Sequence, residues 1–144
     1  MIEIKQQLIE AFSKLCMSRK RGETIEIITP LATITDNLVS IFFSQEDNKW
    51  IISDGGWLME GRYLYLENIS PKVIEYFSGI FNVQKINSSK DTTIYYRDTD
   101  KEGMLTSIAY DVSLFIQSVV NTSKYLSDTG NNLIDEETTN LREI

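Results

Sequence analysis

The sequence predicts an α+β domain, in which an antiparallel sheet of four to six strands is flanked by an N-terminal, a middle and a long C-terminal helix. Apolar residues recur at helical spacing at the start of the chain and again near its end. Between them, β-branched and aromatic runs alternate with short polar connections, which is typical of an antiparallel meander. The 144-residue chain is 42% hydrophobic and 24% charged, the composition of an ordinary globular domain.

The first segment is predicted to be an amphipathic helix. Its apolar residues recur at the spacing of one helix face: Ile4, Leu8, Phe12 and Leu15. Gly22 is the expected end of this helix, because glycine commonly follows the last helical turn. A basic cluster precedes it, formed by Lys14, Arg19, Lys20 and Arg21. We expect this cluster at the helix C-terminus, where positive charge complements the helix dipole.

Residues 24–29 are predicted to form the first strand, because they are rich in β-branched side chains. The alternation places Ile25 and Ile27 on one face and Glu26 on the other. Pro30 is expected to end this strand, since proline donates no ladder hydrogen bond.

Two further strands are predicted to complete the meander. Residues 38–44 are apolar on both faces, and residues 49–53 return after the polar connection 45–48. The segment 63–66 alternates in polarity and is either a short strand or an extended connector.

The middle of the chain carries a clear helix start. Ser70 is the expected N-cap and Pro71 the first helical residue, followed by an apolar face within 73–81. Segments 83–87 and 92–97 are predicted to be two edge-type strands joined by a tight turn.

The long C-terminal helix is predicted over residues 105–126. Its apolar stripe consists of Leu105, Ile108, Ala109, Val112, Phe115, Ile116, Val119 and Val120. Thr99 and Glu102 have the spacing of a capping box for this helix. Beyond residue 126 the chain is polar and loses its periodicity. We therefore predict a single domain over 1–126 and a flexible or weakly docked acidic tail over 127–144.

Composition restricts the chemistry that this chain can perform. The chain has no histidine and one cysteine, so it lacks the commonest general base and cannot form a Cys/His zinc site on its own. We expect no cofactor and no metal. The net charge of −7 disfavours direct binding to nucleic acid, which needs a basic face.

The same features predict a cytoplasmic protein that does not bind a membrane. No continuous apolar run approaches the length of a membrane span, and the N-terminal residues lack the basic and apolar regions of a signal peptide. Cys16 has no second cysteine with which to form an internal disulfide. The sequence leaves the oligomeric state open, including a homo-oligomer.

The segment most suggestive of a function is the turn that follows the strand 49–53. Asp54, Gly55 and Gly56 are expected to turn the backbone sharply with positive φ, leaving the Asp54 carboxylate at the mouth of the sheet. Aromatic residues concentrate around this turn: Trp50, Trp57, Tyr63 and Tyr65. Tryptophan and tyrosine are frequent hot-spot residues of binding surfaces. We expect Trp57 to be the most exposed of this aromatic set.

The run 26–58 carries several short motifs: Thr29-Pro30 at a strand end, Asp36 in the next loop, the Leu38–Phe43 strand, and Ser53-Asp54-Gly55-Gly56 with Leu58 downstream. In these motifs the chain resembles a bacterial and phage family known as domain of unknown function 1828. The resemblance extends over residues 1–85. It implies a small α+β domain with an antiparallel sheet, often linked to mobile elements or phages and without an established activity. It also implies that Asp36 and Asp54 belong either to a site or to a structural turn that the chain shares with this family.

Our leading hypothesis is a non-enzymatic module that binds another protein. The resemblance suits an accessory, regulatory or anti-defence role in a bacterium or its phage. The candidate binding residues are Asp36, Asp54, Gly55, Gly56, Trp57 and Tyr63.

Two alternatives remain open at this point. The first is a divergent magnesium-dependent nuclease, in which Asp36 and Asp54 hold the cation. The second is a sensor of a small, nucleotide-like ligand, whose pocket would consist of Trp50, Trp57, Tyr63 and Tyr65.

Overall fold

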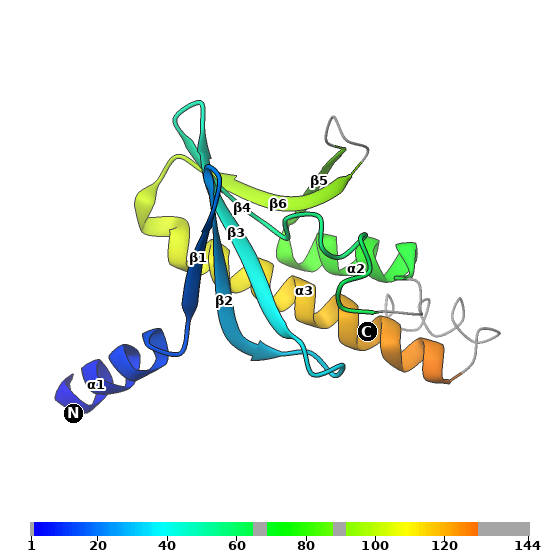
Figure 1. Ribbon diagram of the computed structural model, residues 1–144, viewed down its shortest axis with the longest axis horizontal. Helices are drawn as coiled ribbons and strands as arrows, with labels where there is room; N and C mark the ends of the chain where they lie inside the picture. The colour runs from blue at the N-terminus through cyan, green and yellow to red at the C-terminus, as the bar shows by residue number, and fades with distance from the viewer. Residues whose placement is uncertain (1, 65–68, 88–91, 130–144) are drawn as a thin grey trace.

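The computed structural model describes residues 2–64, 69–87 and 92–129 (Figure 1). Its elements are α1 (Ile2–Ser13), β1 (Met17–Arg21), β2 (Thr24–Ala32), β3 (Leu38–Glu46), β4 (Lys49–Ser53), α2 (Pro71–Phe81), β5 (Gln84–Asn87), β6 (Thr93–Thr99), the 3₁₀ turn η1 (Glu102–Met104) and α3 (Leu105–Asp128). Within these residues, six strands form one antiparallel sheet in the order β1-β2-β3-β4-β6-β5. The predicted α+β fold with an N-terminal, a middle and a long C-terminal helix is confirmed.

Strands β1 to β4 form a meander joined by two-residue turns at both outer hairpins. Gly22 has φ +64° in the β1–β2 turn, and Asp47 and Asn48 have φ +50° and +65° in the β3–β4 turn. Two successive residues with positive φ are the signature of the hairpin turn that matches the natural strand twist. The predicted polar hairpin is confirmed, but its turn consists of residues 47 and 48 alone, because residues 45 and 46 lie on β3.

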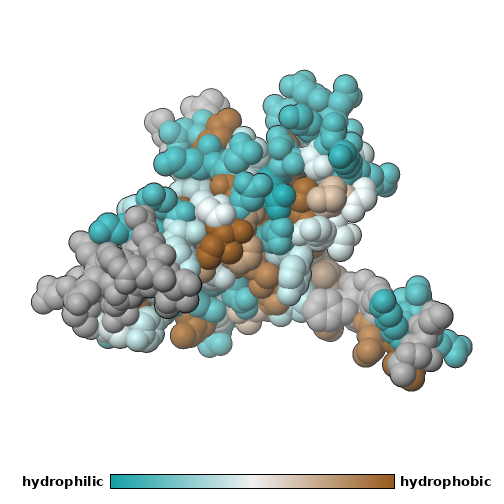
Figure 2. Space-filling model, turned by 180° about the vertical axis from the view of Figure 1, so that it is seen from behind, coloured by the Kyte–Doolittle hydropathy of each residue, from teal (hydrophilic) through white to brown (hydrophobic). Residues whose placement is uncertain are grey.

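The N-terminal helix is shorter than the sequence predicted. It ends at Ser13, and the basic residues 19–21 lie on β1, at one edge of the sheet, so their expected placement at a helix end is wrong. The helical periodicity of the sequence gives no sign that β1 pairs with β2. This pairing satisfies the backbone hydrogen-bonding groups of both strands. Helix α1 projects away from the sheet (Figure 1). Figure 2 shows some hydrophobic side chains on this arm, where Ile4 and Leu8 are exposed.

Strand β2 does not end at Pro30. Its register against β3 shifts between Ile28 and Ala32, so the proline lies in an irregular stretch where its missing N–H breaks no ladder pair. The Thr29 hydroxyl bridges this irregularity, because it donates to the Val39 carbonyl at 2.8 Å and accepts the Leu31 N–H at 3.2 Å.

The strands after α2 also differ from the prediction. Both β5 and β6 form, but of these two strands only β5 lies at an edge of the sheet, because β6 lies between β4 and β5. The alternation of β6 explains its interior place, since Tyr95 is buried and its ring lies 5.7 Å from that of Phe115 on α3. The turn predicted between these strands falls largely on residues 88–91, outside the described part of the chain.

The core lies between one face of the sheet and helices α2 and α3. It includes Val39, Ile41, Ile52, Leu58, Leu64, Val73, Tyr95, Ile108, Val112, Phe115, Ile116, Val119 and Val120. The apolar stripe predicted for the C-terminal helix is thus confirmed. By length and composition alone, Glu102–Asp128 could also cross a membrane, but its buried stripe is accounted for by packing on the sheet.

The predicted helix starts have mixed outcomes. Helix α2 begins at Pro71 after Ser70 as predicted, although the Ser70 side chain makes no capping hydrogen bond. The capping box at Thr99 and Glu102 is wrong. A 3₁₀ turn precedes α3, and the Thr99 hydroxyl accepts the N–H of Lys101 at 3.0 Å. Helix α3 extends to Asp128, and residues 130–144 of the predicted tail lie outside the described residues.

Candidate functional site on the open face of the sheet

Asp54 organises the turn after β4. Its side chain is fully buried. Its Oδ1 accepts the N–H groups of Gly56 at 3.0 Å and Tyr95 at 2.9 Å, and its Oδ2 accepts that of Leu58 at 3.2 Å. Burial raises the pKa of Asp54 to about 6, although these three hydrogen bonds act to lower it. The expectation of a carboxylate open at the mouth of the sheet is wrong, because both of its oxygens serve the backbone.

The two glycines of this turn adopt the predicted conformation. Gly55 and Gly56 have φ +65° and +83°, which only glycine adopts without strain. A Cβ on Gly55 would lie 2.4 Å from Cδ2 of Phe42, and one on Gly56 would lie 2.5 Å from Cγ2 of Thr92. Close approach as well as backbone conformation therefore requires glycine here.

Trp57 lies on the open face of the sheet, where it is half-buried. Its ring meets Phe42 edge-on with centroids 5.1 Å apart, and Tyr63 lies 6.3 Å away at a tilt. Two guanidinium groups face the indole: that of Arg62 at 4.4 Å from the ring centroid and that of Arg21 at 5.9 Å. Trp57 is thereby held in one orientation by aromatic and cation–π contacts.

A buried acid positions one of these arginines. Glu26 is 1% exposed, and it accepts hydrogen bonds from Arg21 Nε at 2.6 Å and from the Ser40 hydroxyl at 2.9 Å. Arg19 Nε lies 3.6 Å from the same carboxylate. Burial acts to raise the pKa of Glu26, but these hydrogen bonds and the charges of both arginines outweigh it and hold the pKa below its usual 4.5. The ionised Glu26 therefore fixes Arg21 beside Trp57.

These residues border a groove of about 590 Å³ across the face of the sheet opposite to the helices. The strand register places side chains from β1, β2, β3, β4 and β6 on this face. The groove is lined by Arg21, Thr24, Phe42, Ser44, Ile51, Ser53, Trp57, Ile94 and Tyr96, among others. A mixed apolar and polar surface of this size is within the range of ligand-binding clefts.

Charge is distributed unevenly along this groove. Arg21 lines it on the side of β1, whereas Glu46 and Asp98 line it near the β3–β4 hairpin. Asp98 is partly neutralised by Lys49, whose Nζ lies 3.8 Å from its Oδ2. The groove is therefore positively charged at Arg21, beside Trp57, and negatively charged at Glu46 and Asp98.

The structure does not bring together Asp36 and Asp54. Asp36 is exposed in the β2–β3 turn with φ +63°, whereas Asp54 follows Ser53, which pairs with Phe42. Leu38 begins β3 four residues before Phe42, about 13 Å along the strand at the usual rise. The described residues also contain no group of three or more acidic or cysteine side chains able to hold a metal ion. Asp36 and Asp54 therefore do not lie close enough together to hold one cation, as the nuclease alternative requires.

The structure does not bring together the described aromatic residues of the ligand-sensor alternative either. Alternation along β4 places Trp50 on the helix-covered side with Ile52, whereas Trp57 lies on the open side. Tyr63 is 3% exposed, and its hydroxyl accepts the N–H of Ser40 at 3.1 Å. Burial raises the pKa of Tyr63 to about 12, which suits a structural role. Tyr65 lies outside the described residues.

Sequence reasoning placed Trp57, Gly55 and Tyr63 at or beside this face but missed most of the groove. The missed residues are Arg21, Glu26, Phe42, Arg62 and Tyr96. The proximity of the four on strands depends on strand register, which has no local signal in the sequence, whereas Arg62 is placed by the loop after β4. Comparison with protein-family models, curated proteins and solved structures finds no match. The resemblance to the domain of unknown function 1828 family therefore stays a prediction.

Proposed function

We propose that this domain is a binding module whose open sheet face, centred on Trp57, binds a segment of a partner protein. One observation carries the proposal: Trp57, Tyr96 and Arg21 line the same groove. Tryptophan, tyrosine and arginine are the residue types that dominate binding energy at protein interfaces. Partly buried apolar side chains between them, including Ile51 and Ile94, provide a floor for an apolar partner side chain.

Preorganisation of these side chains supports the proposal. Arg21 is held by Glu26, and Trp57 is held between Phe42 and the two arginines, Arg21 and Arg62. Side chains that are already ordered lose little conformational entropy when a partner binds.

The charges of the groove favour a polypeptide over a nucleic acid. A phosphate backbone that followed the groove from Arg21 would meet Glu46 and Asp98 at its acidic end. The net charge of −7 also repels a polyanion. A peptide with an apolar or aromatic anchor, an acidic residue near Arg21 and a basic residue near Glu46 is complementary to this arrangement.

Selection from a phage-displayed library of random peptides tests the proposal. Peptides enriched on the wild-type domain are expected to bind about tenfold or more weakly to Tyr96→Ala, because that change removes a groove side chain. Tyr110→Ala is the matched control, since Tyr110 is 59% exposed on α3, on the other side of the sheet. Thermal melting of both variants shows that the fold is retained.

The proposal is overturned if no peptide family is enriched. It is equally overturned if enriched peptides bind the two tyrosine variants alike. The accessory, regulatory or anti-defence role rests on the family resemblance and belongs to this proposal as its biological setting.

A further inference from the structure

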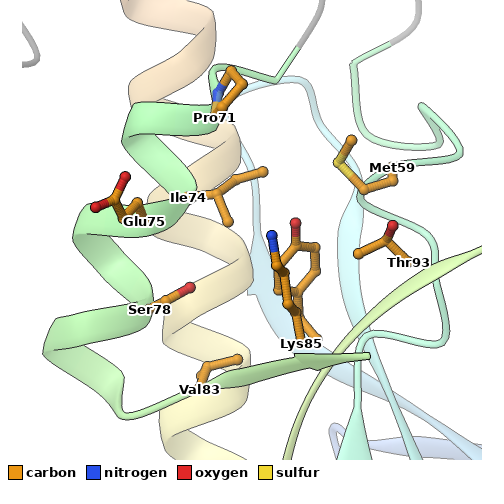
Figure 3. Close-up of a pocket in the computed structure, with 9 residues that line it drawn as sticks. Met59, Pro71, Ile74, Glu75, Ser78, Val83, Lys85 and Thr93 are labelled. Carbon is orange, nitrogen blue, oxygen red and sulfur yellow. The ribbon is translucent and has the colours of Figure 1, made fainter. Parts of the chain in front are cut away.

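A second cavity, of about 550 Å³, lies on the helix-covered side of the sheet, between α2 and strands β5 and β6 (Figure 3). Small-molecule sites typically have volumes of about 300–1,000 Å³. The cavity is separate from the open-face groove, because Tyr95 and Lys85 project to the face opposite to Tyr96 and Gln84. Whatever binds here does not depend on the proposed peptide groove.

The walls of this cavity are mainly apolar. Ile74 projects from α2 into the space and Met59 faces it from the other side, with Val83 at the base and Pro71 at the first turn of the helix (Figure 3). Glu75 also lines the cavity, but Figure 3 draws its carboxylate on the outer side of α2. The apolar walls suit a hydrocarbon chain or ring, which gains free energy when its surface leaves water.

Two hydrogen-bond donors that line this cavity come from neighbouring strands. Lys85 and Tyr95 are direct cross-strand partners on β5 and β6, so their side chains lie on the same face of the sheet. The Lys85 side chain extends into the space between Ile74 and Thr93 (Figure 3). Within the described part of the chain, neither its ammonium group nor the Tyr95 hydroxyl has a hydrogen-bond or ion-pair partner.

The Tyr95 hydroxyl keeps its proton near neutral pH. Burial, and secondarily the charge of Asp54, raise the pKa of Tyr95, so its hydroxyl stays a donor. An ammonium and a hydroxyl on cross-strand partners can both donate to one carboxylate, and charge-assisted hydrogen bonds of this kind are stronger than neutral ones.

We propose that the cavity binds a small amphipathic acid, an apolar chain or ring that ends in a single carboxylate. The carboxylate accepts hydrogen bonds from Lys85 and Tyr95, and the apolar part lies between Ile74 and Met59. The cavity adds a small-molecule site to a domain whose other face is proposed to bind protein.

Methionine-methyl NMR locates binding directly. Protein labelled at its methionine methyl groups is titrated with octanoate, decanoate and 3-phenylpropionate below their aggregation limits, and Met59→Leu assigns the decisive signal. The Met59 signal is expected to shift, because Met59 lines the cavity, whereas Met17 and Met104, which are exposed like Met59 but do not line the cavity, are expected not to move. A shift at Met17 without one at Met59 would place the acid elsewhere and overturn the proposal.

The role of the carboxylate is tested with a neutral analogue and with matched lysine variants. Decanol is expected to bind about tenfold more weakly than decanoate. Lys85→Gln is expected to weaken decanoate about tenfold without changing decanol, and Tyr95→Phe to weaken it by a smaller factor. Lys20→Gln, an exposed lysine on β1, is the control and leaves decanoate affinity unchanged.

Each contrary outcome overturns the proposal. These outcomes are a Met59 signal that moves with none of the three acids, equal affinity for decanoate and decanol, and an equal effect of the two lysine variants. Because Lys85 is exposed, its variant is expected to keep the wild-type NMR spectrum in the absence of ligand. Loss of binding is then assigned to the charge rather than to unfolding.

Discussion

Replacing Asp54 by alanine removes the acceptor of three buried backbone N–H groups, those of Gly56, Leu58 and Tyr95. Each unsatisfied buried donor costs about 1–3 kcal/mol, so three cost about 6 kcal/mol. Part of this is offset at pH 7. Burial raises the pKa of Asp54 from 3.8 to about 6, which makes the ionised group less favourable by about 3 kcal/mol. We therefore expect Asp54→Ala to lower the free energy of unfolding by about 3 kcal/mol at pH 7.

Urea unfolding at pH 7 measures this loss, with Asp100→Ala as an exposed control that changes stability by less than about 0.5 kcal/mol. Asp54→Asn keeps one oxygen for Gly56 and Tyr95 and carries no charge, so we expect it to remain within about 1 kcal/mol of the wild type. A loss below about 1 kcal/mol in Asp54→Ala would refute the assignment of this carboxylate as the acceptor that holds the turn.

The pH dependence of Asp54 provides an independent check. Its folded pKa is raised above its unfolded value of 3.8, so its stabilising contribution is complete below pH 3.8 and is lost as the pH rises through about 6. The stability of the wild type relative to Asp54→Asn should therefore fall by about 2 kcal/mol between pH 4 and pH 7. A difference that stays constant over this range would contradict the role of burial, since the other carboxyl groups are common to both proteins.

Three further changes test the rest of the site. Gly55→Ala should destabilise the protein by more than about 2 kcal/mol in urea unfolding, because it combines an unfavourable φ with a clash against Phe42. Gly22→Ala is the control and should cost only about 1 kcal/mol, because the space around Gly22 is open. Equal losses in the two variants would argue against the close approach of Gly55 to Phe42. Glu26→Gln should cost about 2 kcal/mol at pH 7. The stabilising contribution of ionised Glu26 is present above pH 4.5 and is lost as the pH falls through the lowered pKa of the folded state. If Glu26→Gln costs the same stability at pH 3 as at pH 7, the ionised carboxylate is not the source of that stability. Trp57→Ala should cost about 2 kcal/mol in thermal melting, since the ring is half-buried; no loss would mean that the indole does not pack on the sheet.

Features with a local physical cause were determined by the sequence itself. Ser70-Pro71 starts α2, because proline at the first helical position lacks only an N–H that would have no partner in any case. The turn 54–56 needs glycine conformations, and the stripe of α3 follows from helical periodicity. These causes act within a few residues, so the fold class and most of its elements followed from them.

Tertiary structure decided what depends on pairing between distant segments. The segment 17–21 becomes a strand because β2 satisfies its backbone, and Pro30 is accommodated by a register shift that local rules do not contain. The same register collects Arg21, Trp57 and Tyr96 in one groove and buries Asp54 and Glu26. A carboxylate is tolerated inside the protein only where hydrogen bonds or opposite charges surround it, and those partners come from other strands and turns. The physical role of each acid therefore became visible only in the folded sheet.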